Sequence, residues 1–195
     1  MTQASDRKTQ IILATIECIT RYGYHNFSMQ DLAQLADVSK GIIHYYFLNK
    51  EALMMAVLDH VCRDIEGLLE GTENIVHPAE RLSHVIWMCA DILKTKREYY
   101  RINMDFWTQI YQKENVKSEI AQHYASFRTA IASIIDSGIK KNIFREGNPD
   151  IFATMIIAMI DGIALQYLFD ESLFDYEDLV KNCEMSIMGF LKRVS

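Results

Sequence analysis

The chain has 195 residues, is half apolar and one-quarter charged, and carries a formal net charge of −6, a composition that excludes a disordered chain and a protein that coats nucleic acid over its whole surface. Two prolines and eight glycines interrupt long stretches rich in helix-forming residues, so an all-α fold is expected. The four cysteines are widely spaced without a Cys-x-x-Cys pair, and the first ten residues lack a signal peptide's apolar run, so we expect reduced thiols and a cytoplasmic protein.

The apolar periodicity of the N-terminal part predicts three helices, over residues 6–22, 28–36 and 40–47. Gly23 follows the first helix as a C-cap. Ser28 lies three residues before Asp31, which is an acidic variant of the capping pattern at the start of a helix. The second and third helices are therefore short and separated by a tight turn.

Six more helices are expected, because the same periodicity continues and both prolines are placed as in the first turn of a helix. A long fourth helix begins at Lys50 and closes near Gly71. The others are predicted over residues 78–95, 98–112, 116–141, 149–169 and 175–193. The prediction is an all-α protein of about nine helices in two domains, residues 1–50 and 51–195, joined by the fourth helix.

The first three helices follow the helix-turn-helix plan, in which the second short helix enters the DNA major groove. Residues 1–50 hold five basic and four acidic side chains, so the acidic body is left with −7 and a local phosphate-facing patch is permitted. The residues expected nearest the bases are Lys40, Gly41, Ile42 and His44. Those expected to hold phosphates are Ser28, Ser39, Tyr45, Tyr46 and Lys50. A small core helix is the alternative, and it would bury the polar ends of Lys40, His44 and Tyr45.

The stretch SMQDLAQLADVSKGIIHYYFLNKEALMMAVL resembles the DNA-binding signature of the TetR family of bacterial one-component repressors. The resemblance runs from residue 6 to about residue 60, and it implies the same phosphate-contacting and base-contacting positions. Two positions depart from the family pattern. Asp37 stands where the turn often has glycine, and aspartate tolerates a left-handed conformation better than most residues. His44 stands where tyrosine is most common, so the operator preference of other members does not transfer.

The stretches INMDFWTQIYQ, IIDSGIKKNIF and IIAMIDGIALQYLFD resemble regulatory domains of the branch that includes the betaine-pathway repressor. Residues 151–169 are apolar nearly all round, so one face should meet a partner. The resemblance implies a homodimer in which this helix and the last one form a four-helix bundle with their copies. The residues expected at this interface are Ala158, Gly162, Leu165, Cys183, Ile187 and Leu191. The alternative is a central helix buried in a monomer.

A pocket for a small-molecule effector is expected among the fourth to eighth helices. Its candidate residues are rings, a thioether and one carboxylate: Trp87, Tyr100, Met104, Trp107, Tyr111, Phe127 and Asp161. Plain core packing is the alternative for each of them. If Asp161 faces the pocket, a cationic ligand is favoured. The effector would lower operator affinity by preferring a conformation in which the two DNA-binding heads are wrongly spaced.

The predicted function is a ligand-responsive transcriptional regulator, in the repressing mode common in the family, that binds a palindromic operator of double-stranded DNA. Two alternatives remain. A helical adaptor would bind a protein partner through the same N-terminal helices, residues 1–50, here called the head. A metal-dependent bundle enzyme would use Glu-x-x-His spacing, but the Glu and His residues at 80 and 84, and at 119 and 123, are four apart. No phosphate loop or nucleophile motif is present in the sequence, so we expect no cofactor, metal or catalytic residue.

Overall fold

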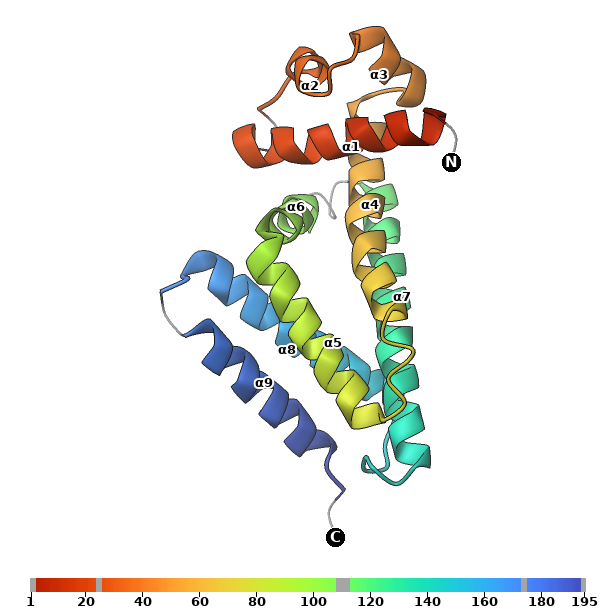
Figure 1. The fold of residues 1–195 in the computed structure, drawn as a ribbon, viewed down its shortest axis with the longest axis vertical. Coiled ribbons are helices and arrows are strands. Elements are labelled where there is room, and N and C mark those ends of the chain that lie inside the picture. Colours follow the sequence, from red (N-terminus) through yellow and green to blue (C-terminus); the bar gives the residue numbers. More distant parts are fainter. Residues whose placement is uncertain (1–2, 24–25, 108–112, 173–174, 194–195) are drawn as a thin grey trace. The chain divides into compact units, whose positions relative to one another are not determined.

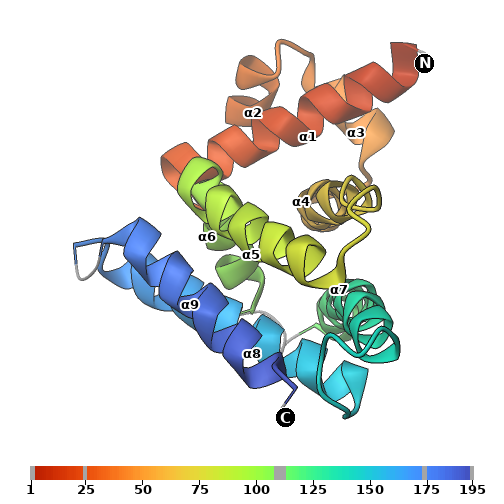
Figure 2. The same cartoon turned by 60° about the horizontal axis from the view of Figure 1, so that its bottom comes forward.

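The computed structural model describes residues 3–23, 26–107, 113–172 and 175–193, and this part of the chain is all-α. It contains nine helices (Figures 1 and 2): α1 (Gln3–Tyr22), α2 (Met29–Leu35), α3 (Lys40–Tyr46), α4 (Lys50–Glu70), α5 (Pro78–Thr95), α6 (Arg97–Trp107), α7 (Glu114–Lys140), α8 (Pro149–Phe169) and α9 (Tyr176–Leu191). The predicted fold class and helix order are confirmed. Most ends differ from the prediction by three residues or fewer, and α6 is described only to Trp107.

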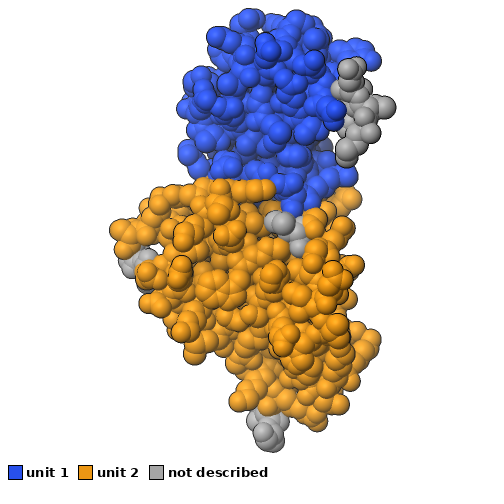
Figure 3. Space-filling view, in the orientation of Figure 1, with its two compact units in different colours: residues 1–64, 98–120 blue, residues 65–97, 121–195 orange. Residues whose placement is uncertain are grey.

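The chain forms two compact units, coloured separately in Figure 3. Unit 1 comprises residues 1–64 and 98–120, and unit 2 comprises residues 65–97 and 121–195. Unit 1 therefore holds the predicted DNA-binding helices together with most of α6 and the start of α7. The functional division at residue 50 stays a prediction, because the compact units follow packing and do not test it.

The helix ends of unit 1 show why these short elements form. Ser28 accepts a hydrogen bond from the Asp31 amide, and the Asp31 carboxylate accepts one from the Ser28 amide at 2.8 Å, which completes a capping box at α2. Gly23 has φ +86° and Asp37 has φ +49°. The left-handed conformations expected after α1 and in the turn before α3 are thus present. Two buried side chains, Leu32 and Ile43, anchor α2 and α3 on their inner faces.

Unit 2 has a core to which α5, α7, α8 and α9 contribute. Its buried members include Leu82 and Val85 of α5, Ile135 of α7, Ile156 of α8 and Ile187 of α9. Asn148 caps α8 with its side chain, and Pro149 occupies the first helical position, as expected. Unit 2 is therefore a helix-on-helix domain with one continuous apolar core.

Three residues predicted at a dimer interface belong to this core. Cys183, Ile187 and Leu191 are 7 %, 1 % and 0 % exposed in the single chain, so the expectation that they face a partner is wrong. They lie on the face of α9 that packs inward. Ala158 on α8 is exposed, and Gly162 and Leu165 are partly exposed, so these three predicted positions remain open to a partner.

Candidate DNA-binding site

Helix α3, which is predicted to enter the DNA major groove, is held by its inner face and by the preceding turn. Ile43 is fully buried and Phe47, which caps the helix at its C-terminal end, is 3 % exposed. The Gln10 amide of α1 donates a 2.8 Å hydrogen bond to the carbonyl of Ala36, at the end of α2. Ser39 accepts a hydrogen bond from the Ile42 amide at 3.3 Å and so caps α3. The helix is therefore fixed at both ends and along its buried face.

The outer face of α3 is turned to solvent. The five predicted residues Lys40, Gly41, Ile42, His44 and Tyr45 are all exposed. Tyr45 is 83 % exposed, and its ring meets the partly buried ring of Tyr46 edge-on at 5.1 Å between centroids. The alternative of a core helix with inward-facing Lys40, His44 and Tyr45 does not fit this arrangement. A polar, partly aromatic surface remains, of the kind that contacts base edges and phosphates.

Two predicted phosphate contacts have partners inside the protein. The Lys50 ammonium donates to the carbonyl of Phe27 at 2.9 Å and lies 3.9 Å from the centre of the Phe27 ring. Burial lowers the pKa of the Lys50 ammonium from its ordinary value. The Ser28 hydroxyl donates to the Asp31 carboxylate at 2.6 Å, and the hydrogen bonds from Ser28 lower the pKa of that carboxyl. Both residues thus shape the start of α2. For Ser28 this is the capping role predicted from the sequence, whereas the contact of Lys50 with Phe27 was not predicted.

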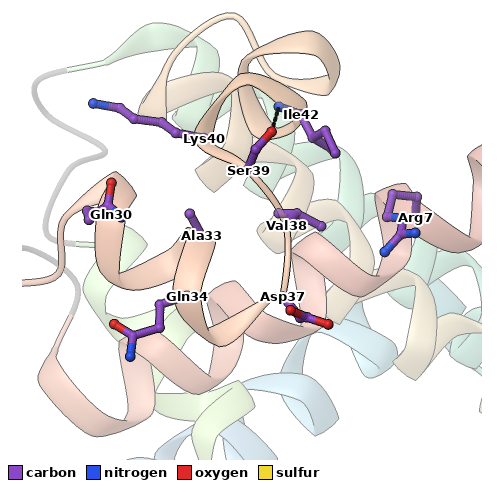
Figure 4. A pocket seen from close by; sticks show the side chains of 9 residues that line it. All are labelled: Arg7, Gln30, Ala33, Gln34, Asp37, Val38, Ser39, Lys40 and Ile42. Carbon is purple, nitrogen blue, oxygen red and sulfur yellow. Dashed lines mark hydrogen bonds between the residues drawn. The ribbon is translucent and has the colours of Figure 1, made fainter.

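A concave surface lies at the turn between α2 and α3 (Figure 4). Its lining residues are Arg7, Gln30, Ala33, Gln34, Asp37, Val38, Ser39, Lys40 and Ile42. Gln30 and Gln34 were missed by the sequence reasoning. They lie one helical turn apart and are exposed, whereas Leu32 between them is buried. The i, i+4 spacing of two amides opposite a core leucine is the signal that would have identified them.

The charges around this concave surface are mixed. Arg7 and Lys40 contribute positive charge, and the exposed carboxylate of Asp37 contributes a negative one. The Arg7 guanidinium also donates to the side-chain oxygen of Gln10 at 3.0 Å. Glutamine amides pair with adenine edges through two hydrogen bonds, whereas arginine and lysine suit phosphates or guanine. The surface therefore presents amide groups that can hydrogen-bond to base edges and cationic groups that can bind phosphates.

The structure places the predicted effector-binding residues in both units. Tyr100 and Met104 lie on α6 in unit 1 and are partly buried. Trp87, Phe127 and Asp161 lie in unit 2. The side chain of Trp107 and all of Tyr111 lie outside the described residues. These predictions of ligand contact remain untested.

The unit 2 members of that set are held by hydrogen bonds. Trp87 donates its ring N–H to the Glu184 carboxylate at 2.8 Å, which links α5 to α9. Asp161 is partly buried, and its carboxylate accepts a 2.8 Å hydrogen bond from the Tyr124 hydroxyl. Burial raises the pKa of the Asp161 carboxyl, and the hydrogen bond from Tyr124 opposes this rise. Asp161 is thus a partly buried carboxyl with one described hydrogen-bond partner, and the prediction that it faces an effector stays untested.

Two family models match this chain. The model described as bacterial regulatory proteins of the tetR family matches residues 11–57, and the model described as the C-terminal part of BetI-type transcriptional repressors matches residues 78–192. Among curated relatives, the nicotine-responsive repressor HdnoR of Paenarthrobacter nicotinovorans is 26 % identical over 97 % of this chain and 96 % of its own length. A BetI regulator of Paraburkholderia xenovorans is 26 % identical over 87 % of this chain and 85 % of its own.

Solved structures show the same fold. A transcriptional regulator from Saccharomonospora viridis in complex with choline has a TM-score of 0.88 at 22 % identity, covering 97 % of this chain and all of that one. FadR of Bacillus subtilis in complex with stearoyl-CoA has a TM-score of 0.75 at 22 % identity, covering 94 % and 98 %. The BetI-type model alone spans more than half of the chain, from residue 78 to residue 192. The chain therefore belongs to the TetR family of bacterial transcriptional regulators and is a DNA-binding, ligand-responsive regulator with a BetI-type C-terminal domain.

Proposed function

We propose that the protein is a repressor that binds a palindromic operator as a homodimer through α3 and is released by a small-molecule effector. The observation that carries this proposal is the two-sided nature of α3. Ile43 and Phe47 fix the helix from within, while Lys40, Ile42 and His44 are exposed along its outer face. A short helix held in this way presents a constant set of side chains to the major groove.

The DNA contacts divide into two groups in this proposal. Lys40, Gly41, Ile42 and His44 lie against base edges, joined by Gln30 from the concave surface. Tyr45, Tyr46 and Arg7 hold phosphates. Ser28 and Lys50 act on DNA mainly by positioning α2, because their described hydrogen bonds are within the protein. The cytoplasm, where bacterial DNA lies, is the proposed location.

The dimer would form through α8. This helix is long and apolar enough to cross a membrane by length and composition, yet its inner face packs in the core of unit 2. Its other face leaves Ile151, Met155 and Met159 exposed to 57 %, 49 % and 39 %. A contiguous apolar surface of this kind is more often an interaction site than a surface that stays exposed to solvent. A second copy covers it best, because a twofold dimer places two α3 helices on two half-sites of one operator.

The effector would be a small cation that pairs with Asp161. The support is the desolvated carboxylate of Asp161 and its hydrogen bond to Tyr124. A choline-bound structure with the same fold and a nicotine-responsive relative are consistent with this chemistry. Thermal-shift measurements with choline and with nicotine test it. A cation that stabilises the wild type should have no effect on Asp161→Asn, and equal stabilisation of both proteins would contradict the role of Asp161.

Selection of genomic DNA fragments on the purified protein at moderate salt tests the main proposal. We expect an enriched palindrome whose half-sites are about one DNA turn, or a whole number of turns, apart. The logarithm of the binding constant should fall linearly with the logarithm of the salt concentration. Tyr45→Ala should weaken binding to all sequences by a similar factor, and His44→Ala should change the preferred base. If no palindrome is enriched, the adaptor alternative gains the stronger position.

A further inference from the structure

The first turn of α4 connects two parts of unit 1 that are distant in the sequence. The Lys113 ammonium lies 3.2 Å from Oε1 of Glu51, and the Asn115 amide donates to the same oxygen at 3.4 Å. These hydrogen bonds hold the pKa of the Glu51 carboxyl below its ordinary value. Lys113 and Asn115 lie at the start of α7, inside the region that matches the BetI-type C-terminal model, but they belong to unit 1.

The residue next to Glu51 makes the opposite connection. Lys50 donates to the carbonyl of Phe27 at 2.9 Å, and Phe27, 3 % exposed, directly precedes the Ser28 cap of α2. Adjacent residues of one helical turn therefore bind the start of α7 on one side and the start of α2 on the other. The contacts thus run from Lys113 to Glu51 and from Lys50 to Phe27, and Glu51 and Lys50 are joined by a peptide bond.

The ion pair between Glu51 and Lys113 is not isolated, because other contacts of unit 1 also join α4, α6 and α7. The Tyr99 hydroxyl of α6 donates to the Asp64 carboxylate of α4 at 2.9 Å. Ile102 and Phe106 of α6 are fully buried, and Val116 of α7 is 2 % exposed. The segment that carries Lys113 is thus anchored by apolar burial on both sides. Its displacement would require Glu51 to move or to lose its partner.

We propose that Glu51 and Lys113, with Asn115, form a clamp through which the start of α7 controls the position of the helix-turn-helix. The regulatory meaning of this clamp rests on the proposed function, in which an effector bound to the C-terminal region changes operator affinity. The clamp itself is a property of unit 1 and can be tested without DNA or effector. An exposed ion pair contributes little to global stability, so its effect should appear in local opening instead.

Hydrogen exchange of the free, full-length protein tests the clamp. Lys113→Gln should speed amide exchange in residues 26–36 by up to about fivefold, the range that the loss of an exposed ion pair allows. Lys113→Arg, which keeps the charge, should restore slow exchange. Glu17→Gln removes another exposed ion pair of unit 1, between Glu17 and Arg21 of α1, and serves as the matched control that leaves residues 26–36 unchanged.

A double variant distinguishes the clamp from a general loosening. Glu51→Gln together with Lys113→Gln should speed exchange no more than either change alone, because both remove the same interaction. Additive effects, or faster exchange limited to residues 50–56, would overturn the proposal. If exchange follows the expected pattern while genomic selection yields no operator, the clamp stands and the proposed function fails.

Discussion

The ammonium of Lys50 lies 3.9 Å from the centre of the Phe27 ring and donates a 2.9 Å hydrogen bond to the carbonyl of the same residue. A basic residue at the start of α4 thereby fixes the segment that leads into α2. Hydrogen bonds from charged groups contribute about 1.5–3 kcal/mol, and a cation over an aromatic face adds about 0.5–2 kcal/mol. The pair is therefore a structural element of the DNA-binding head as well as a candidate phosphate contact.

Lys50→Met should lower both stability and operator affinity, because it removes the charge and both contacts with Phe27 while keeping the aliphatic stem. The expected loss is about 1–3 kcal/mol of unfolding free energy, measured by urea denaturation. Tyr45→Ala is the comparison, since its 83 % exposed ring should matter for DNA and leave the urea midpoint almost unchanged. A wild-type midpoint for Lys50→Met would show that the Phe27 contacts contribute nothing to stability.

Asp37 should be replaceable by glycine or asparagine but not by alanine. Its φ of +49° lies in the left-handed region, where a residue with a Cβ and no local hydrogen bonding costs about 1–2 kcal/mol. Asp37→Ala should therefore destabilise the protein by about 1 kcal/mol, and Asp37→Gly or Asp37→Asn should not. Denaturant unfolding of the three variants provides the measurement. Equal stability of the alanine and glycine variants would contradict the strain assigned to this turn.

The local structure of the head was predictable because its signals are local. Ser28 and Asp31 are three residues apart, so their capping box depends on no distant residue, and Asp37 was expected in the left-handed conformation for the same reason. The partner of Lys50 was not predictable. Phe27 is 23 positions away, and only the packing of α1, α2 and α4 decides whether the ammonium meets a carbonyl or solvent.

The inward and outward faces of α9 were harder to assign from periodicity. The sequence correctly predicts an apolar stripe on α9 that contains Cys183, Ile187 and Leu191. A stripe indicates that a face is buried, but it does not say whether the same chain or a partner covers it. The structure shows that α5 and α8 of the same chain pack against α9 and provide it. Glu51 and Lys113 illustrate the same limit for ion pairs, because no sequence pattern relates charges more than sixty positions apart.

Gly138→Ala should destabilise unit 2. A Cβ at this position would lie 2.1 Å from Cδ2 of Phe144, whose ring is 4 % exposed and has little room to move. Overpacking of this kind costs about 1–3 kcal/mol, which corresponds to a melting temperature lower by about 2–4 °C for each kcal/mol. Gly67→Ala on α4 is the matched control. Nothing lies within 4 Å of its added methyl group, and the higher helix propensity of alanine should raise stability slightly.

Met155→Asp tests the apolar face of α8 as a dimer interface. Met155 is 49 % exposed in the single chain, so the monomer should tolerate the charge, whereas a covered interface would have to bury it. We expect the dimer dissociation constant to rise at least about tenfold, measured by sedimentation equilibrium. Leu13→Asp on α1 places the same charge at a similarly exposed apolar residue and should leave the assembly unchanged. An unchanged dissociation constant for Met155→Asp would remove α8 from the interface.

Asp161→Asn should raise the stability of the ligand-free protein at neutral pH. Burial raises the pKa of the Asp161 carboxyl in the folded state, so the folded state binds its proton more tightly than the unfolded state does. The penalty of the ionised, partly buried group is therefore present above the folded-state pKa and is relieved as the pH falls through it. Asparagine keeps an oxygen that accepts the hydrogen bond from Tyr124 and carries no charge. Melting temperatures of the two proteins, compared between pH 7 and pH 4, should converge as the solution is acidified. If the wild type is instead the more stable protein at neutral pH without added ligand, an unrecognised cationic partner of Asp161 within the protein must compensate its charge.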